Sequence, residues 1–117
     1  MMKYVLLMYA NQESVPQTPE AQRAAAPAWS ALATEMKSAG VWVSSSGLRP
    51  VADATTVRVR DGKTLITDGP FAETHEQLGG FFLLECQDLD EALRWAEKIP
   101  TATYGSIEVR PLWSQES

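Results

Sequence analysis

The side chains best suited to chemistry lie in one short polar stretch, from Asp68 to Glu76. Asp68 precedes Gly69-Pro70, a combination typical of a turn. Its carboxylate either transfers protons at the edge of a cavity or accepts a hydrogen bond from a nearby backbone N–H and holds the turn. The two roles are compatible, because loops on a rigid scaffold often carry function. Asp68 is therefore the candidate catalytic residue, and we expect it to shape its own turn as well.

His75 is the one histidine of the chain, and it lies between the carboxylates of Glu73 and Glu76. It could act as a general base assisted by these carboxylates. The polar surroundings favour an exposed loop residue, and we expect substitution of His75 to be tolerated. Whether His75 or Glu73 takes part in a site stays open. The acidic residues lack a fixed ligand spacing of the His-x-x-x-His kind, so we expect no metal and no cofactor.

Two of the four tryptophans stand where they could contact a ligand. Trp29 lies on the apolar stripe of a predicted helix, and Trp42 lies on a predicted strand beside the serines at 44–46. An aromatic wall next to hydroxyl groups suits a pocket for an organic molecule. Packing in a core or an interface is the competing explanation, because tryptophan is enriched in both. The candidate ligand contacts are Trp29, Trp42 and Phe71.

The apolar periodicity predicts six strands and two helices around these residues. The strands are expected over Lys3–Ala10, Val41–Leu48, Thr55–Arg60, Lys63–Thr67, Gly80–Cys86 and Ser106–Leu112.

Local capping and turn signals predict where these elements begin and end. Thr18 can cap the first helix, which we expect to kink at Pro27 and to continue as a main helix to Ser38. Asp88, with a glutamate three residues later, is typical of a capping box for the second helix. Asp61-Gly62 between two strand-forming runs predicts a hairpin.

This order of elements predicts an α+β fold, with a ferredoxin-like split βαβ sheet that carries both helices on one face. The strands around Tyr4 and Phe81 are apolar on both of their alternating faces. Two helices on one side leave the second face uncovered, and an identical subunit is the commonest cover for such a face. We therefore expect a homodimer.

The composition narrows the class of protein. A chain of 117 residues is the size of one domain, and we expect residues 1–117 to form a single one. The net charge of −5 argues against nucleic acid or an anionic membrane as a partner. Cys86 is the one cysteine, and we expect it to be an inert buried thiol in a cytoplasmic protein.

The polar stretch around Asp68 closely resembles the signature of the DGPF-domain, YCII-related (YciI-like) family. The matching residues are Thr67-Asp68-Gly69-Pro70-Phe71-Ala72-Glu73-Thr74 and Glu76-Gln77-Leu78-Gly79-Gly80-Phe81, followed by Asp88–Leu93 and Ser106–Pro111. The resemblance covers nearly the whole chain. It implies a dimeric α+β barrel in which two ferredoxin-like sheets pack face to face, and it supplies no agreed activity.

In the YciI-like branch of this family, a histidine on the first helix and an aspartate near the end of the second are proposed as an acid–base pair. This sequence has Trp29 and Ile99 at those positions. The lyase activity associated with that pair is therefore not carried over to this chain.

Two hypotheses on function stay open. The first is a domain that binds a small organic molecule in a barrel pocket, with lyase- or isomerase-type acid–base chemistry as an extension of it. The second is a non-enzymatic regulatory or interaction protein, since the resemblance implies association with extracytoplasmic-function sigma factors.

Overall fold

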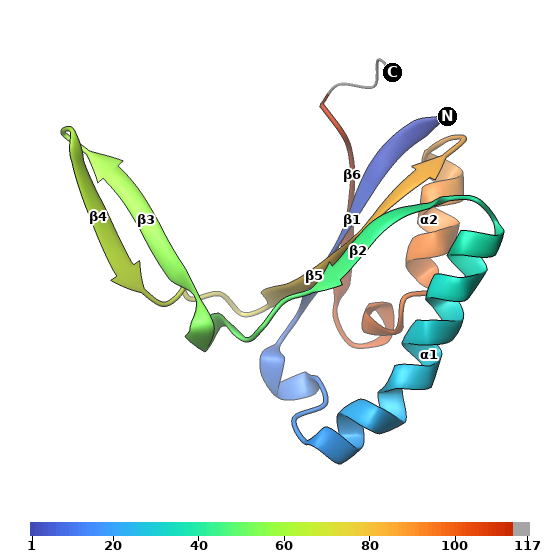
Figure 1. The fold of residues 1–117 in the computed structure, drawn as a ribbon, viewed down its shortest axis with the longest axis horizontal. Helices are drawn as coiled ribbons and strands as arrows, with labels where there is room; N and C mark the ends of the chain where they lie inside the picture. Colours follow the sequence, from blue (N-terminus) through green and yellow to red (C-terminus); the bar gives the residue numbers. More distant parts are fainter. Residues whose placement is uncertain (114–117) are drawn as a thin grey trace.

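The structure, a computed structural model, describes residues 1–113, and its elements follow the order expected from the sequence (Figure 1). The strands are β1 (Met2–Ala10), β2 (Trp42–Gly47), β3 (Thr55–Arg60), β4 (Lys63–Asp68), β5 (Gln77–Cys86) and β6 (Ser106–Pro111). The helices are α1 (Pro19–Ser38) and α2 (Leu89–Glu97), and the 3₁₀ turns are η1 (Gln12–Ser14), η2 (Val51–Asp53) and η3 (Pro100–Thr103). The fold is mixed α+β, as predicted.

Four strands form one antiparallel sheet in the order β2-β5-β1-β6. The central strand β1 pairs with β5, with Leu6 opposite Phe82, and with β6, with Leu6 opposite Val109. Strand β5 therefore lies between β1 and β2, which run parallel to each other and are joined through α1. The described chain forms an open sheet and no closed barrel.

Helix α1 begins and ends on the signals read from the sequence. The Thr18 side chain accepts from the backbone N–H of Ala21 at 3.0 Å, and Gly40 follows the helix with a φ of +76°. Residues on both sides of Pro27 belong to one continuous helix, Pro19–Ser38, rather than to a short helix followed by a main helix from Pro27. Proline lacks only one N–H, and its position is exposed, so the ring is accommodated on the solvent side.

Helix α2 also starts as predicted. The Asp88 carboxylate accepts from the Glu91 N–H at 2.9 Å, and the Glu91 carboxylate in turn accepts from the Gln87 N–H at 2.7 Å. Both helices lie on the same side of the sheet in Figure 1. The core fills the space between them and the sheet, and it includes Tyr4, Leu6, Leu32, Met36, Val41, Phe82, Leu84, Trp95 and Ile99.

The other face of the sheet has no helix over it (Figure 1). It carries the alternate residues of the two central strands, and among them Val5, Leu7, Phe81 and Leu83 form the apolar centre. Val5 opposes Leu83, and Leu7 opposes Phe81. These four residues are called the open-face cluster below. Their side chains are only half-buried in the single chain, so apolar surface remains in water.

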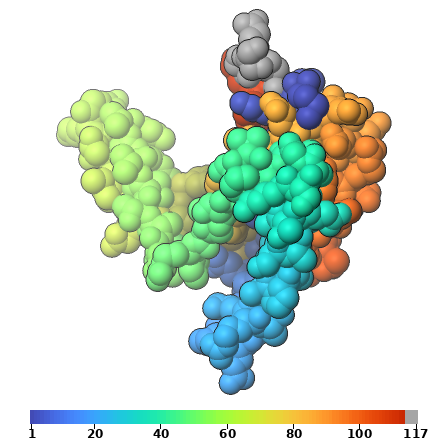
Figure 2. Space-filling model, turned by 45° about the vertical axis from the view of Figure 1, so that its right-hand side comes forward, coloured from blue at the N-terminus to red at the C-terminus, as the bar shows by residue number. Residues whose placement is uncertain are grey.

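Strands β3 and β4 form a separate two-stranded sheet that projects from the body (Figures 1 and 2). Their turn is the predicted one, with φ of +52° at Asp61 and +73° at Gly62. The projection extends the molecule. The radius of gyration is 16.2 Å, whereas a compact chain of this length has about 13 Å.

No helix within residues 1–113 is both long enough and apolar enough to cross a membrane.

Candidate functional site

A cleft of about 840 Å³ lies between the first half of α1 and the sheet. Its floor comes from Met8 on β1 and Phe82 on β5, and its far wall comes from α1. The first half of α1 is rich in alanine, with Ala25 and Ala26 facing the space. Alanine side chains are too short to reach the sheet, so the first half of α1 is separated from it. The second half packs against the core through its buried residues Leu32 and Met36.

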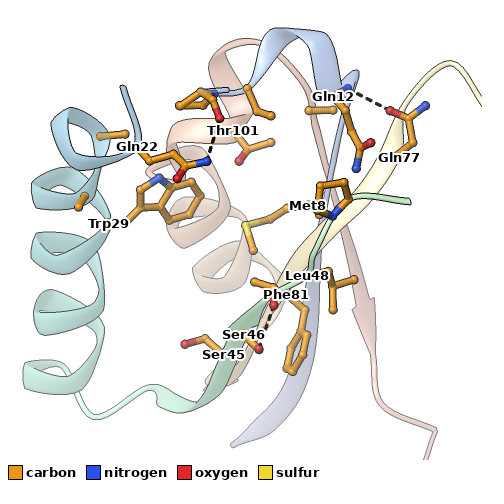
Figure 3. Close-up of a pocket in the computed structure, with 18 of the residues that line it drawn as sticks. Met8, Gln12, Gln22, Trp29, Ser45, Ser46, Leu48, Gln77, Phe81 and Thr101 are labelled. Atoms are coloured by element: carbon orange, nitrogen blue, oxygen red, sulfur yellow. Dashed lines mark hydrogen bonds between the residues drawn. The ribbon is translucent and has the colours of Figure 1, made fainter. Parts of the chain in front are cut away.

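Trp29 is the large side chain that α1 extends into this cleft. Figure 3 shows its ring pointing from the helix toward Met8. The ring stacks on Phe82, with centroids 6.3 Å apart and planes inclined by 15°. Offset stacking of this kind holds an aromatic ring in one orientation. Trp29, one of the predicted ligand contacts, is part of the cleft lining.

The polar part of the lining consists of neutral side chains. The Gln77 amide oxygen accepts from the Gln12 N–H at 3.0 Å (Figure 3). The Gln77 amide nitrogen donates to the Thr74 carbonyl. Gln22 donates to the Pro16 carbonyl at 3.4 Å from the helix side. The remaining polar lining residues are Gln17, Ser30, Ser45, Ser46, Thr101 and Tyr104.

The lining contains no aspartate, glutamate, histidine, lysine or arginine among residues 1–113. Amide and hydroxyl groups can donate to and accept from a ligand, but they do not compensate a buried ionic charge as an opposite charge would. The cleft therefore favours neutral molecules that combine an apolar body with a few hydrogen-bonding groups.

Asp68 lies outside this cleft, at the end of β4 on the projecting hairpin. Its side chain is exposed and accepts no hydrogen bond from the described residues. The turn is held by other groups: the Gly69 N–H donates to the Ala54 carbonyl at 2.6 Å, and the Thr56 hydroxyl donates to the Gly69 carbonyl at 2.8 Å. The expectation that the Asp68 carboxylate holds its own turn is thus wrong for this chain, because the adjacent Gly69 N–H donates to the Ala54 carbonyl and the Thr56 hydroxyl secures the Gly69 carbonyl.

We expect Asp68→Ala to change the free energy of unfolding by less than about 0.5 kcal/mol, as for other exposed side chains without a partner. Thr56→Val removes the hydroxyl at nearly constant volume and should cost about 1 kcal/mol of local stability. Amide hydrogen exchange at Gly69 measures this directly. Faster exchange in Asp68→Ala than in Thr56→Val would contradict the assignment.

The other predicted contacts also lie apart from the cleft. Trp42 packs against the core, donates to the Ser45 hydroxyl at 3.1 Å, and has the Lys37 ammonium 4.6 Å from its ring centroid. Phe71 is 74% exposed in the loop after β4. The structure therefore brings neither of them together with Trp29 or with Asp68 in one lining.

The remaining titratable candidates lie outside the cleft as well. His75 and Glu73 are exposed in the loop before β5. The polar surroundings of His75 in the sequence favoured such an exposed loop position. No cluster of three or more histidine, cysteine, aspartate or glutamate side chains within residues 1–113 is arranged to hold a metal ion.

Cys86 is fully buried at the end of β5. Burial raises the pKa of its thiol to about 11, and the nearby Glu91 and Asp88 carboxylates add to the effect. The thiol is therefore protonated at neutral pH and a poor nucleophile, which agrees with the expected inert side chain.

Sequence reasoning missed most of the cleft. Gln12, Gln22, Gln77 and Tyr104 come from four separate segments, and no spacing along the chain links them. One usable signal was the alanine-rich first half of α1, since a helix face of alanines beside a single tryptophan leaves space against a sheet.

Comparison with known proteins gives two findings. The sequence model of the YCII-related domain matches residues 2–116. An uncharacterised protein of Rhizobium meliloti (strain 1021) is 42% identical over 115 residues, which span 95% of this chain and 92% of that protein.

Proposed function

This chain belongs to the YCII-related family, and we propose that it binds an uncharged, mainly apolar small molecule in the cleft between α1 and the sheet. The observation that carries the proposal is the chemistry of the lining. Two stacked aromatic rings provide the apolar platform, and fixed amides provide hydrogen bonds, without a charged side chain. The volume of about 840 Å³ lies within the range of small-molecule pockets.

Binding, rather than proton transfer, is the activity proposed for this cleft. A lyase or isomerase needs a positioned acid or base within hydrogen-bond reach of the substrate. Asp68 is not part of the lining, and the resemblance to the YciI-like branch implies that Trp29 stands where that branch has its histidine. Trp29 supplies a stacking surface and no group that transfers a proton.

Two probes of matched shape test the proposal: 2-naphthamide, which is neutral, and 2-naphthoate, which is anionic at pH 7. We expect titration calorimetry to show the amide binding at least about 10-fold more tightly, because the carboxylate loses its hydration without gaining a counter-charge. Trp29→Ala should weaken amide binding by at least about 10-fold through loss of the stacking surface.

Trp113→Ala is the matched control, because the Trp113 side chain is fully exposed and its removal should leave amide binding unchanged. Equal affinity for the two probes would contradict the neutral-ligand proposal. Amide binding that survives Trp29→Ala would place the ligand elsewhere. If neither probe binds at about 1 mM, the proposal that the cleft binds a small molecule is also contradicted.

A second proposal concerns assembly: two chains pair through the open-face cluster, so that two ferredoxin-like sheets form a dimeric α+β barrel. The four apolar side chains of this cluster support the pairing, since they are only half-buried in the single chain and no helix covers their face of the sheet (Figure 1). The accessible surface supports it as well. It measures 8092 Å², whereas a compact monomer of this mass exposes about 6,300 Å². Sedimentation equilibrium should give twice the chain mass of 12.9 kDa at micromolar concentration.

A further inference from the structure

We propose that the β3–β4 hairpin is a dimerisation arm, whose apolar face packs against a second copy of this chain. The inference rests on the dimer proposed above, and it names the segment of each chain that extends onto the partner.

The hairpin has two chemically different faces. Val57, Val59 and Ile66 lie on one face, where Val57 and Ile66 form a directly opposed cross-strand pair. Their side chains are 60%, 59% and 68% exposed. The opposite face carries Arg58, Arg60, Lys63 and Leu65. One face of the ribbon thus holds three of its four exposed apolar residues, a concentration typical of a surface that is covered in the assembled molecule.

The hairpin has little support from its own chain. Strands β3 and β4 pair with each other and with no other described strand. The side-chain contacts from the arm to the rest of the chain are at its base, where Thr56 and Arg58 donate to the Gly69 and Phe71 carbonyls. A two-stranded hairpin is at best marginally stable alone in water. Packing of its apolar face against another surface would add the stability that the hairpin lacks in the single chain.

A second copy of this chain fits the arm by area. The surface in excess of a compact monomer is about 1,800 Å² per chain. Burial of that excess on both chains gives an interface of about 3,600 Å², which is within the range of obligate homodimers. In a two-fold dimer both arms are buried by one symmetric contact, so each chain covers the exposed face of the other.

Charge also favours a second copy. The arm, residues 55–68, holds three basic and two acidic residues, so it carries +1. The whole chain carries −5, which leaves −6 on the rest of the chain. The basic side chains lie on the face opposite the apolar contact, so they add only a long-range attraction between the arm and the acidic body of the partner, and the apolar face makes the contact itself.

Two neighbouring substitutions on opposite faces test the arm. Ile66→Asp places a carboxylate on the apolar face, and Leu65→Asp places the same charge one residue earlier on the basic face, where the leucine is 48% exposed. Both change the net charge equally, so a difference between them reports on the face. We expect sedimentation equilibrium of the full chain to show at least about 10-fold weaker dimerisation for Ile66→Asp and less than about 3-fold for Leu65→Asp. Far-UV circular dichroism checks that both variants keep the body folded.

The outcomes separate the arm from the dimer itself. If Leu7→Asp on the open face dissociates the dimer while Ile66→Asp does not, the sheet-to-sheet dimer stands and the arm proposal is wrong. Equal weakening by Ile66→Asp and Leu65→Asp overturns it too, because the effect would then come from charge. A wild-type chain that sediments as a monomer at about 100 μM overturns the arm and the dimer together.

Discussion

Gly105→Ala is expected to destabilise the protein by more than about 3 kcal/mol, the largest effect of a single methyl group that we anticipate in this fold. Gly105 lies between η3 and β6, directly against the end of β1. A Cβ atom there would overlap the Tyr9 carbonyl oxygen and lie 3.0 and 3.1 Å from the Ala10 Cβ and Cα atoms. Because the clash is with backbone, relief requires β1 and β6 to move apart where Tyr9 pairs with Ser106.

Urea unfolding at fixed protein concentration measures this effect, and Gly47→Ala serves as the control. A Cβ at Gly47 meets no atom within 4 Å, so its substitution should change stability by less than about 0.5 kcal/mol. Equal stability of the two variants would show that the β1 end tolerates a side chain at position 105. The comparison also bears on the cleft, since Ala10 belongs to its lining.

Leu7→Asp should weaken dimerisation by more than about 1,000-fold, because it places a charge at the centre of the proposed interface. Leu7 lies on the central strand of the open face, directly opposite Phe81 on β5 and Glu108 on β6. An aspartate at this position would put a second carboxylate next to Glu108 and in the middle of the open-face cluster. Its side chain points away from the helices, so the substitution leaves the core residues Leu6 and Met8 in place. Sedimentation equilibrium should therefore find a folded monomer.

The matched control is Ala28→Asp, which adds the same charge on the exposed surface of α1, on the other side of the sheet. We expect it to sediment as the wild-type dimer. A Leu7→Asp chain that remains dimeric would rule out the open face as the contact surface. Thermal melting of both variants separates lost assembly from lost folding.

Much of the fold could be predicted from the sequence because its signals are local. Thr18 and Asp88 cap the helices within four residues of the groups they satisfy, and Asp61-Gly62 adopts the positive φ values that a two-residue hairpin turn needs. The alternation of apolar residues in β1 and β5 determined which side chains share a face. It also showed that both faces are apolar, which is the basis of the dimer prediction.

Two local expectations were overturned by the surroundings of the residues. The segments before and after Pro27 form one helix instead of a short and a main one, because the exposed proline costs the helix one hydrogen bond and leaves the others in place. Asp68 does not hold its turn, because the Gly69 N–H that its carboxylate could have accepted from donates to the Ala54 carbonyl instead. Sequence patterns indicate which residue types can hold a turn, but they do not show which groups of the folded chain lie within hydrogen-bond distance of it.

The sequence by itself determined the family, the order of elements, the caps, the hairpin turn and the two-faced strands, since each depends on residues a few positions apart or on the match of nearly the whole chain. Tertiary structure alone decided where the cleft lies and what lines it. Trp29, Gln77 and Tyr104 meet because α1, β5 and η3 pack around one end of the sheet, and Asp68 is kept away because the hairpin projects from the body. Such juxtapositions depend on how elements pack over long separations along the chain, and the spacing of residues within a segment carries no information about them.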